Sequence, residues 1–542
     1  MIDPEDFMHY FAHRQRQHMS IVIAIGLVFA NLIGACSPET QSSEPITTTL
    51  RPVVTLAATT QTPTATTTQT PVMQTSITTP SPVVAACASD PALAGVRYDI
   101  SAELDWLAHK IEVEQYVTFR NDTNALITNL AFNIEANQDE ESFLLTRITT
   151  PEGKLISRYT LDSTHLTIPL RAALKPNCET TLILDYTLQI PEIQDGYNEG
   201  HLGYWGYSAR QTNLGMWLPL VAAQDHDGAW ITPAPHWLGE HFVLRTADFV
   251  VELMVKNAPE NLQVAGPGGV SQPGDYIWRF EITNAREVAI SLSDQFQTLQ
   301  TTTEDGVVVE LFYFADPDVP TLDTPRHALF TAADAMALYH DLYGPYPYDR
   351  VVVVEGDFPD GMEFCGLVFV SEDWFRTWQG VPNDWLTIIT AHEIAHQWWY
   401  ALVGNDQGQC PYLDEALAIY SEVLFFEHYY PDYLDWWWDF RVMVYEPTGY
   451  VDTPIYDFYS PRGYINAIYL RGARMMHLLR ADIGDDQFWA WLRTYATRMA
   501  DQIAYPADFW GALPSEVYVQ TAATRANYLR QPDLVFSPDR IP

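Results

Sequence analysis

Basic residues are scarce in this 542-residue chain, which has 29 Lys and Arg against 69 Asp and Glu and a formal net charge of −40. Binding to nucleic acid needs a surplus of basic side chains that neutralise phosphates, so the composition argues against a nucleic-acid partner. Cysteine is also rare, with five in all. Hydrophobic residues make up 47% of the chain and aromatic residues 13%, which is enough for the cores of two or three folded units.

Residues 1–35 are typical of an export signal. Arg14 and Arg16 precede an apolar run of about 13 residues, which is too short to cross a bilayer but suits a signal peptide. The run ends in Leu-Ile-Gly-Ala-Cys at Cys36, which resembles the lipobox of bacterial lipoproteins. That resemblance implies cleavage before Cys36 and a lipid anchor that holds the protein at the outer face of the cell membrane. A short signal anchor with an incidental cysteine is the alternative, and Met8 is an alternative start.

Residues 36–88 are predicted to be a disordered stalk, because this stretch is rich in Thr and Pro and has almost no aromatic side chains. With Cys36 bearing lipid, four cysteines remain in an oxidising compartment, and four cysteines allow three pairings. We favour a disulfide between Cys87 and Cys178, which flank the first half of the following strand-rich region.

Residues 89–302 are predicted to form an all-β domain, a sandwich or saddle of sheets. Apolar residues alternate with polar ones in short runs such as KIEVEQYVTFRN and TTLILDYTL, and turn residues separate the runs. Residues 303–542 mix the strand patterns VVVELFYFA and VVVVEG with long helical patterns. This second region is therefore predicted to be an α+β domain.

A candidate metal-binding motif lies in a predicted helix that Asn383 or Asp384 can cap and that ends near Gly404. His392 and His396 are four residues apart, so both imidazoles project from one helix face toward a single ion. Glu393 lies close to that ion without binding it, which is where a base for water activation is needed.

A third ligand is expected from the next predicted helix. Glu415 follows His396 after 18 residues, which is enough for a turn and an antiparallel return. The set of two histidines and one glutamate, with a position left open for water, is typical of catalytic zinc sites holding one ion. Asp414 is a candidate for orienting one histidine, although a simple charge at a helix N-terminus is an equal alternative.

These motifs together resemble the M1 family of zinc aminopeptidases, a gluzincin group. The resemblance rests on HEIAHQWWY followed after 18 residues by the glutamate of YLDEALA, on DGMEF at 360–364, on YLRG at 469–472 and on YGPYPYDRVVVVEGDF at 343–358. It implies a β saddle followed by a thermolysin-like catalytic domain, and peptides as substrates.

Within that family the loop at Gly361, Met362 and Glu363 contacts substrate, so the resemblance implies that Glu363 binds the free α-amine of a peptide. It also implies that Tyr469 stabilises the oxyanion while Glu393 activates water. The sequence departs from the family at Phe364, where relatives have Asn, and Gln211 is a weak counterpart of the glutamine that helps bind the amine.

Two of the remaining cysteines flank the cleft that the resemblance implies, since Cys365 follows the loop at 361–363 and Cys410 precedes Glu415. We therefore expect a Cys365–Cys410 disulfide. The predicted function is a lipid-anchored zinc aminopeptidase that removes N-terminal residues. A related zinc hydrolase with endopeptidase specificity and a non-catalytic binding lipoprotein are the alternatives, and the oligomeric state is left open.

Overall fold

The structure of the chain is a computed structural model that describes residues 95–138, 141–193, 203–225, 227–315 and 323–533, all in one compact unit. The predicted signal and stalk, with Cys36 and Cys87, lie outside the described residues. Among the helices that are described, none is long and apolar enough to cross a membrane.

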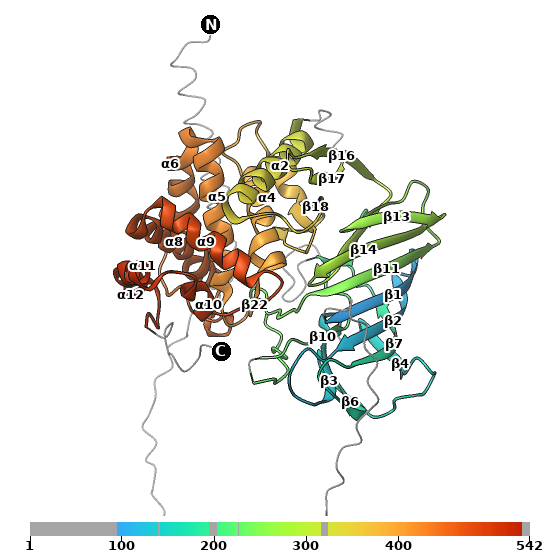
Figure 1. Ribbon diagram of the computed structural model, residues 1–542. Helices are drawn as coiled ribbons and strands as arrows, with labels where there is room; N and C mark the ends of the chain where they lie inside the picture. Colours follow the sequence, from blue (N-terminus) through green and yellow to red (C-terminus); the bar gives the residue numbers. More distant parts are fainter. Residues whose placement is uncertain (1–94, 139–140, 194–202, 226, 316–322, 534–542) are drawn as a thin grey trace, which may run out of the picture. The chain divides into compact units, whose positions relative to one another are not determined.

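A seven-stranded sheet dominates the first half of the chain (Figure 1), with strand order β13-β14-β11-β1-β2-β7-β4. Its strands are β1 (Val96–Asp105), β2 (Lys110–Arg120), β4 (Phe143–Thr149), β7 (Glu179–Gln189), β11 (Ala247–Lys256), β13 (Gly269–Gly274) and β14 (Ile277–Ala285). Buried and solvent-facing residues alternate along β2, because one face of the sheet covers a core and the other faces water. The alternation predicted from the sequence is therefore confirmed for this strand.

Two four-stranded sheets complete the strand-rich half. The first contains β3 (Ile127–Asn133), β5 (Thr160–Asp162), β6 (His165–Leu174) and β10 (Leu220–Val221). The second contains β8 (Trp205–Tyr207), β9 (Thr212–Leu214), β12 (Gln263–Ala265) and β15 (Ile290–Ser293).

A five-stranded sheet begins the second half, in the order β16-β17-β18-β20-β19. Its strands are β16 (Phe296–Thr302), β17 (Val308–Phe314), β18 (Arg350–Gly356), β19 (Gly361–Met362) and β20 (Leu367–Ser371). β16 and β17 form an antiparallel hairpin, so the predicted boundary between residues 302 and 303 falls inside this hairpin. β19 is an edge strand, paired only with β20 among the described strands.

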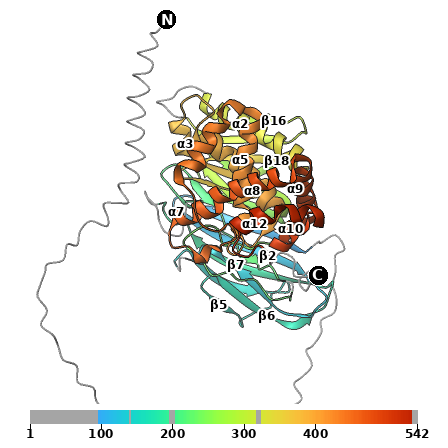
Figure 2. The ribbon, with the colours of Figure 1, turned by 90° about the vertical axis from the view of Figure 1, so that its left-hand side faces the viewer.

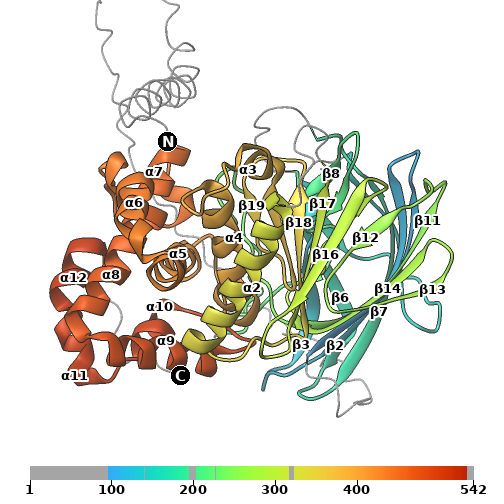
Figure 3. The same ribbon diagram turned by 90° about the horizontal axis from the view of Figure 1, so that it is seen from above.

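Helices make up most of the remaining chain: α2 (Asp323–Tyr343), α3 (Glu372–Thr377), α4 (Trp385–Ala395), α5 (Glu415–Tyr429), α6 (Leu434–Trp437), α7 (Pro461–Tyr464), α8 (Arg471–Ile483), α9 (Asp485–Met499), α10 (Pro506–Gly511), α11 (Ser515–Tyr518) and α12 (Ala522–Tyr528). The short strands β21 (Gly404–Asn405) and β22 (Ile503–Ala504) pair in parallel. α2 and α4 lie beside the five-stranded sheet with α5 beyond α4 (Figure 3), and α5 packs against α8, which packs against α9 (Figure 2).

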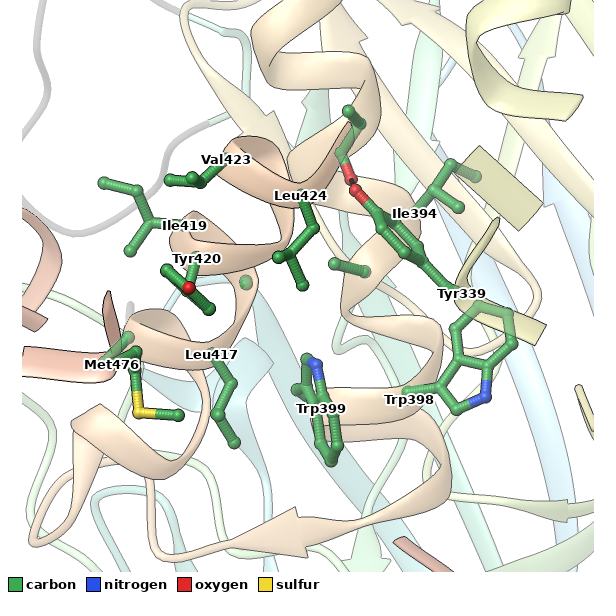
Figure 4. Packing of buried hydrophobic residues seen from close by; sticks show 14 of the residues in the cluster. Tyr339, Ile394, Trp398, Trp399, Leu417, Ile419, Tyr420, Val423, Leu424 and Met476 are labelled. Carbon is green, nitrogen blue, oxygen red and sulfur yellow. Dashed lines mark hydrogen bonds between the residues drawn. The ribbon is translucent and has the colours of Figure 1, made fainter. Parts of the chain in front are cut away.

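A core of buried hydrophobic residues packs α4 against α5. Ile394 of α4 and Leu417 and Leu424 of α5 are buried in it, with Trp398 and Trp399 from the turn after α4 (Figure 4). Interiors of this kind are close-packed, so the relative position of the two helices is well determined. A strand-rich half followed by a helix-rich half is the predicted fold class, which is confirmed.

One buried arginine joins the two halves. Arg286, at the end of the strand-rich half, donates hydrogen bonds to the carbonyls of Leu244, Tyr400, Leu402 and Gln502, at 2.5–3.2 Å. Its side chain is almost fully buried, at 2% exposure. Because a buried cation is costly unless its donors are satisfied, these carbonyl contacts are needed to keep Arg286 at the junction.

Candidate metal centre

The two histidines of the HExxH motif lie at the C-terminal end of α4. The helix begins where the Asp384 side chain accepts a hydrogen bond from the Leu386 amide, which confirms the predicted cap. The sequence predicts one continuous helix to about Gly404, but α4 ends at Ala395 and a π-helical turn, Gln397–Leu402, follows. Such turns are frequent at functional sites, and here the turn begins directly after His396.

Glu415 is the first residue of α5, and its carboxylate meets both imidazoles. The His392 Nε2 and His396 Nε2 atoms are 3.1 Å apart. Glu415 Oε2 lies 3.3 Å from His392 Nε2 and 3.6 Å from His396 Nε2. The three side chains are buried, so these atoms form a compact triangle shielded from bulk water.

This triangle fits a zinc ion. Zinc–nitrogen and zinc–oxygen bonds are about 2.0–2.1 Å, and tetrahedral angles at that bond length place neighbouring ligand atoms about 3.3 Å apart. The three edges of 3.1, 3.3 and 3.6 Å lie close to this value. Three lone pairs directed at one point also repel one another unless a cation lies between them.

Two buried carboxylates orient the imidazoles through hydrogen bonds to their Nδ1 atoms. His392 Nδ1 donates to Glu422 Oε1 at 2.8 Å, and His396 Nδ1 donates to Asp414 Oδ1 at 2.6 Å. With the proton held at Nδ1, each Nε2 keeps its lone pair for a metal. Asp414 thus takes the orienting role that the sequence left open. Glu422 was not anticipated, although it lies two helical turns after Glu415 on the same face of α5.

The ionisation of His392 reflects this acidic surrounding. Burial lowers the pKa of His392, but hydrogen bonds to Glu415 and Glu422 outweigh burial and raise the pKa to about 9. The site therefore favours a positive charge at the point where the ligand atoms converge. Arg441 balances the charge of Glu422 through hydrogen bonds of 3.2 Å to both of its oxygens.

Glu393 lies between the metal ligands and the loop at 361–363. Its Oε2 atom is buried and has no hydrogen-bond partner among the described residues, so this oxygen is free to take a proton from water. Burial raises the pKa of Glu393 well above its usual range. Gly361 packs directly against it, since a Cβ atom added at Gly361 would lie 2.1 Å from Glu393 Oε1. Glycine at this position is therefore required for the carboxylate to occupy its place.

Tyr469 contacts two of the three ligand residues. Its ring stacks on the His392 imidazole with 6.0 Å between the ring centroids, and its hydroxyl hydrogen-bonds to Glu415. A second tyrosine, Tyr464, hydrogen-bonds to Tyr469 and was not anticipated from the sequence. The two tyrosines provide hydroxyl donors beside the position where a substrate carbonyl would meet the metal.

Successive side chains at 362–364 face alternately the core and the metal ligands. Glu363 faces the site, with an oxygen that lies within 4.8 Å of ligand atoms on Glu393 and His396. Met362 and Phe364 point the other way and are buried in the core of the strand-rich half. The Phe364 ring meets Tyr204 edge-on at 5.7 Å, so the residue that departs from the family pattern serves packing.

Gln211, the weak candidate for amine binding, does not reach the site. Its amide donates to Ser291 Oγ and to the Glu355 carbonyl, and its Oε1 accepts from the Asp357 amide. These partners lie in β15, in β18 and directly after β18. They occupy the hydrogen-bonding groups of the Gln211 side chain.

The expected Cys365–Cys410 disulfide is wrong, because both thiols are free. Cys365 is buried in the core of the strand-rich half, where its sulfur lies 3.6 Å from Glu287 Oε2, whereas Cys410 packs against the core of the helix-rich half. Cys178 is disulfide-bonded. Cys87 lies outside the described residues, so the Cys87–Cys178 pairing stays a prediction.

The sequence of this region matches a known family and known proteins. Residues 327–525 match the Peptidase family M1 domain. The chain is 24% identical over 238 residues to human endoplasmic reticulum aminopeptidase 2, which covers 40% of this chain and 24% of the relative. It is 25% identical over 257 residues to aminopeptidase N of Lactobacillus delbrueckii subsp. lactis, covering 44% and 30% respectively. The matched region thus spans less than a third of these relatives.

Among solved structures, the M1 zinc metallopeptidase from Deinococcus radiodurans has a similar fold, with a TM-score of 0.56 at 17% identity over 81% of this chain and 96% of that one. A mutant of that enzyme bound to a Tyr-Ser-Ala substrate gives a TM-score of 0.57 at 16% identity over the same shares. At this identity the likeness shows the fold alone. The match to the Peptidase family M1 domain covers residues 327–525, the part of the chain that holds His392, His396 and Glu415.

Proposed function

We propose that this protein is a zinc-dependent aminopeptidase that removes N-terminal residues from peptides. The observation that carries the proposal is the triangle of His392, His396 and Glu415, whose edges match tetrahedral zinc coordination. The names of the curated relatives, which are aminopeptidases, and the peptide bound by the Deinococcus mutant support the same reaction class.

The surrounding residues divide the chemistry among them. A bound zinc ion would polarise the scissile carbonyl and make water a stronger acid. Glu393 takes the proton from the attacking water at its free Oε2 atom and passes it to the leaving amine. Tyr469 donates a hydrogen bond to the oxyanion that forms as the carbonyl is attacked. Burial of all these groups keeps competing water away from the reacting atoms.

The substrate backbone has an edge strand available to it. β19 is paired on one side with β20, and Gly361 in β19 touches Glu393. An extended peptide can add to such an edge and so bring its carbonyl toward the metal. Glu363, next along the chain, then lies where the free α-amine of the first residue ends, which favours removal of one residue at a time.

Blocking the amine tests this function. A peptide with a free N-terminus should be hydrolysed about 10- to 150-fold faster, in kcat/KM, than its N-acetylated form, because a charged hydrogen-bonded contact contributes about 1.5–3 kcal/mol. Activity should need about one zinc ion per chain and disappear with a chelator. Equal rates on both peptides would identify an endopeptidase instead, and no hydrolysis of either by the zinc-loaded protein would favour a binding protein.

We further propose that the protein acts outside the cytoplasm, attached to the membrane through Cys36. The signal-like residues 1–35 and the disulfide bond of Cys178 support an oxidising extracellular location. A Cys36→Ser variant expressed in a bacterial host should lose metabolic labelling by a fatty acid and be released from the membrane fraction. Labelling that persists in this variant would contradict the anchor.

A further inference from the structure

Asp360 directly precedes the edge strand β19 and has an unusual backbone. Its φ is +71°, in the left-handed region, and the Ser371 amide fixes this conformation by donating to the Asp360 carbonyl at 2.9 Å. Glycine takes this conformation without steric cost, whereas a residue with a side chain is uncommon there, and such outliers cluster at functional sites. The turn alone therefore does not explain why this position carries a carboxylate.

The Asp360 carboxylate lies on the wall of an open site. The residue is exposed to water, yet burial by the surrounding protein raises its pKa, while the nearby Arg441 and His392 lower it. No other side chain among the described residues donates a hydrogen bond to this carboxylate. Arg441 instead directs its hydrogen bonds to Glu422, at 3.2 Å. The charge of Asp360 is therefore available to a ligand.

Asp360 and Glu363 lie near different metal ligands. Glu363 has an oxygen within 4.8 Å of ligand atoms on Glu393 and His396. Asp360, at the other end of β19, is close enough to His392 for the two charges to interact. A peptide whose amine lies at Glu363 and that pairs with β19 must run toward Asp360. Because one extended residue advances about 3.3 Å, the residue after the cleaved bond comes opposite Asp360.

Aromatic rings continue from the His392 side of the site. The Arg441 guanidinium, which shares Glu422 with His392, lies 5.1 Å from the centre of the Trp385 ring. Trp385 stacks on Trp374 with 5.5 Å between the ring centroids, and both rings are only partly buried. They belong to α4 and α3; α4 contacts β19, and α3 contacts α4 (Figure 3). Partly exposed rings near a carboxylate suit a side chain with an apolar stem and a cationic head.

We propose that Asp360 is a specificity-determining residue that favours lysine or arginine as the second residue of the substrate, directly after the cleaved bond, with the Trp385 ring against the stem of that side chain. The proposal rests on the aminopeptidase function proposed above. It concerns the leaving part of the peptide, on the His392 side, and not the amine end at Glu363.

Two tripeptides that differ only at the second residue test the proposal. One carries lysine there, and the other carries norleucine, which has an uncharged aliphatic side chain of similar length. The parent protein should give a kcat/KM about 5- to 10-fold higher for the lysine peptide, mainly through KM, since a charge-assisted contact in an accessible site is stronger than an exposed surface pair. Asp360→Asn should bring this ratio to about one, because Asn also adopts a left-handed backbone but has no charge.

The matched control is Asp373→Asn on α3, where the carboxylate pairs with Arg376. This variant should keep the parent ratio. Trp385→Leu should lower kcat/KM for both tripeptides by a similar factor, because both stems lose the same ring. Unchanged values for both peptides in this variant would remove Trp385 from the subsite.

A salt series keeps the test decisive if Asp360→Asn does not fold. Raising the ionic strength from about 0.01 M to about 1 M shortens the screening length from about 30 Å to about 3 Å, so the lysine-to-norleucine ratio of the parent protein should fall toward one. A ratio that survives Asp360→Asn or high salt would overturn the assignment, as would equal hydrolysis of both tripeptides by the parent protein. If the parent protein does not distinguish a free-amine peptide from its N-acetylated form, the proposed function fails instead.

Discussion

Glu393→Gln should lower kcat by at least about 100-fold, since a general base contributes typically 10²–10⁴ to the rate. The amide cannot accept the proton of the attacking water, whereas its shape preserves the contact with Gly361. Zinc content should remain near one ion per chain, because Glu393 is not one of the three atoms of the ligand triangle. The measurement is kcat with a free-amine peptide, together with metal analysis of the same preparation.

The matched control is Glu427→Gln on α5, where the carboxylate pairs with Arg480 and not with a metal ligand. This variant should keep the parent rate. A Glu393→Gln protein that hydrolyses peptides at the parent rate would assign the base to another residue.

Neutralising the carboxylate that accepts a hydrogen bond from Nδ1 of either histidine should weaken zinc binding. In Glu422→Gln or Asp414→Asn the imidazole loses its anionic partner at Nδ1, and we expect zinc affinity to fall about 10- to 100-fold, as is typical for such partners. Competition with a chromogenic chelator measures the dissociation constant. Activity should return when zinc is added in excess, because the three direct ligands are unchanged.

The two variants should also differ from each other. Glu422→Gln leaves Arg441 buried without a full negative partner, and breaking a buried pair costs about 3–5 kcal/mol. Its thermal unfolding temperature should therefore fall further than that of Asp414→Asn, in which Gln407 still contacts the side chain at position 414. Unchanged zinc affinity in both variants would show that the carboxylates serve packing alone.

The metal ligands could be predicted from the sequence because each depends on short-range geometry. His392 and His396 lie one helical turn apart, and Glu415 is the first residue of the next helix, as the spacing of 18 residues suggests. Strand predictions such as that for β2 rest on the alternation of apolar and polar residues along one segment. The buried and exposed side chains of β2 alternate in the same way. In these cases the sequence neighbours are also the spatial neighbours.

The sequence did not predict the residues that lie near the site only because of the tertiary fold. Glu240 lies near Glu363 and Glu415 in the irregular segment 231–246, and Gln407 contacts Glu363 and Asp414 from the loop before α5. Neither segment has a periodic pattern that marks one face. The disulfide failed for the opposite reason. Cys365 and Cys410 both flank site segments along the chain, but they lie in different hydrophobic cores, so closeness in sequence to one cleft did not mean closeness in space.

The junction at Arg286 limits how this protein can be divided. A fragment that begins at residue 303 would leave the carbonyls of Tyr400, Leu402 and Gln502 without their common donor. It would also expose Phe369 and other side chains that are buried in the core shared with the strand-rich half. The helix-rich half is therefore not an independent module, and transferring the proposed activity to another scaffold requires the β-sheets as well.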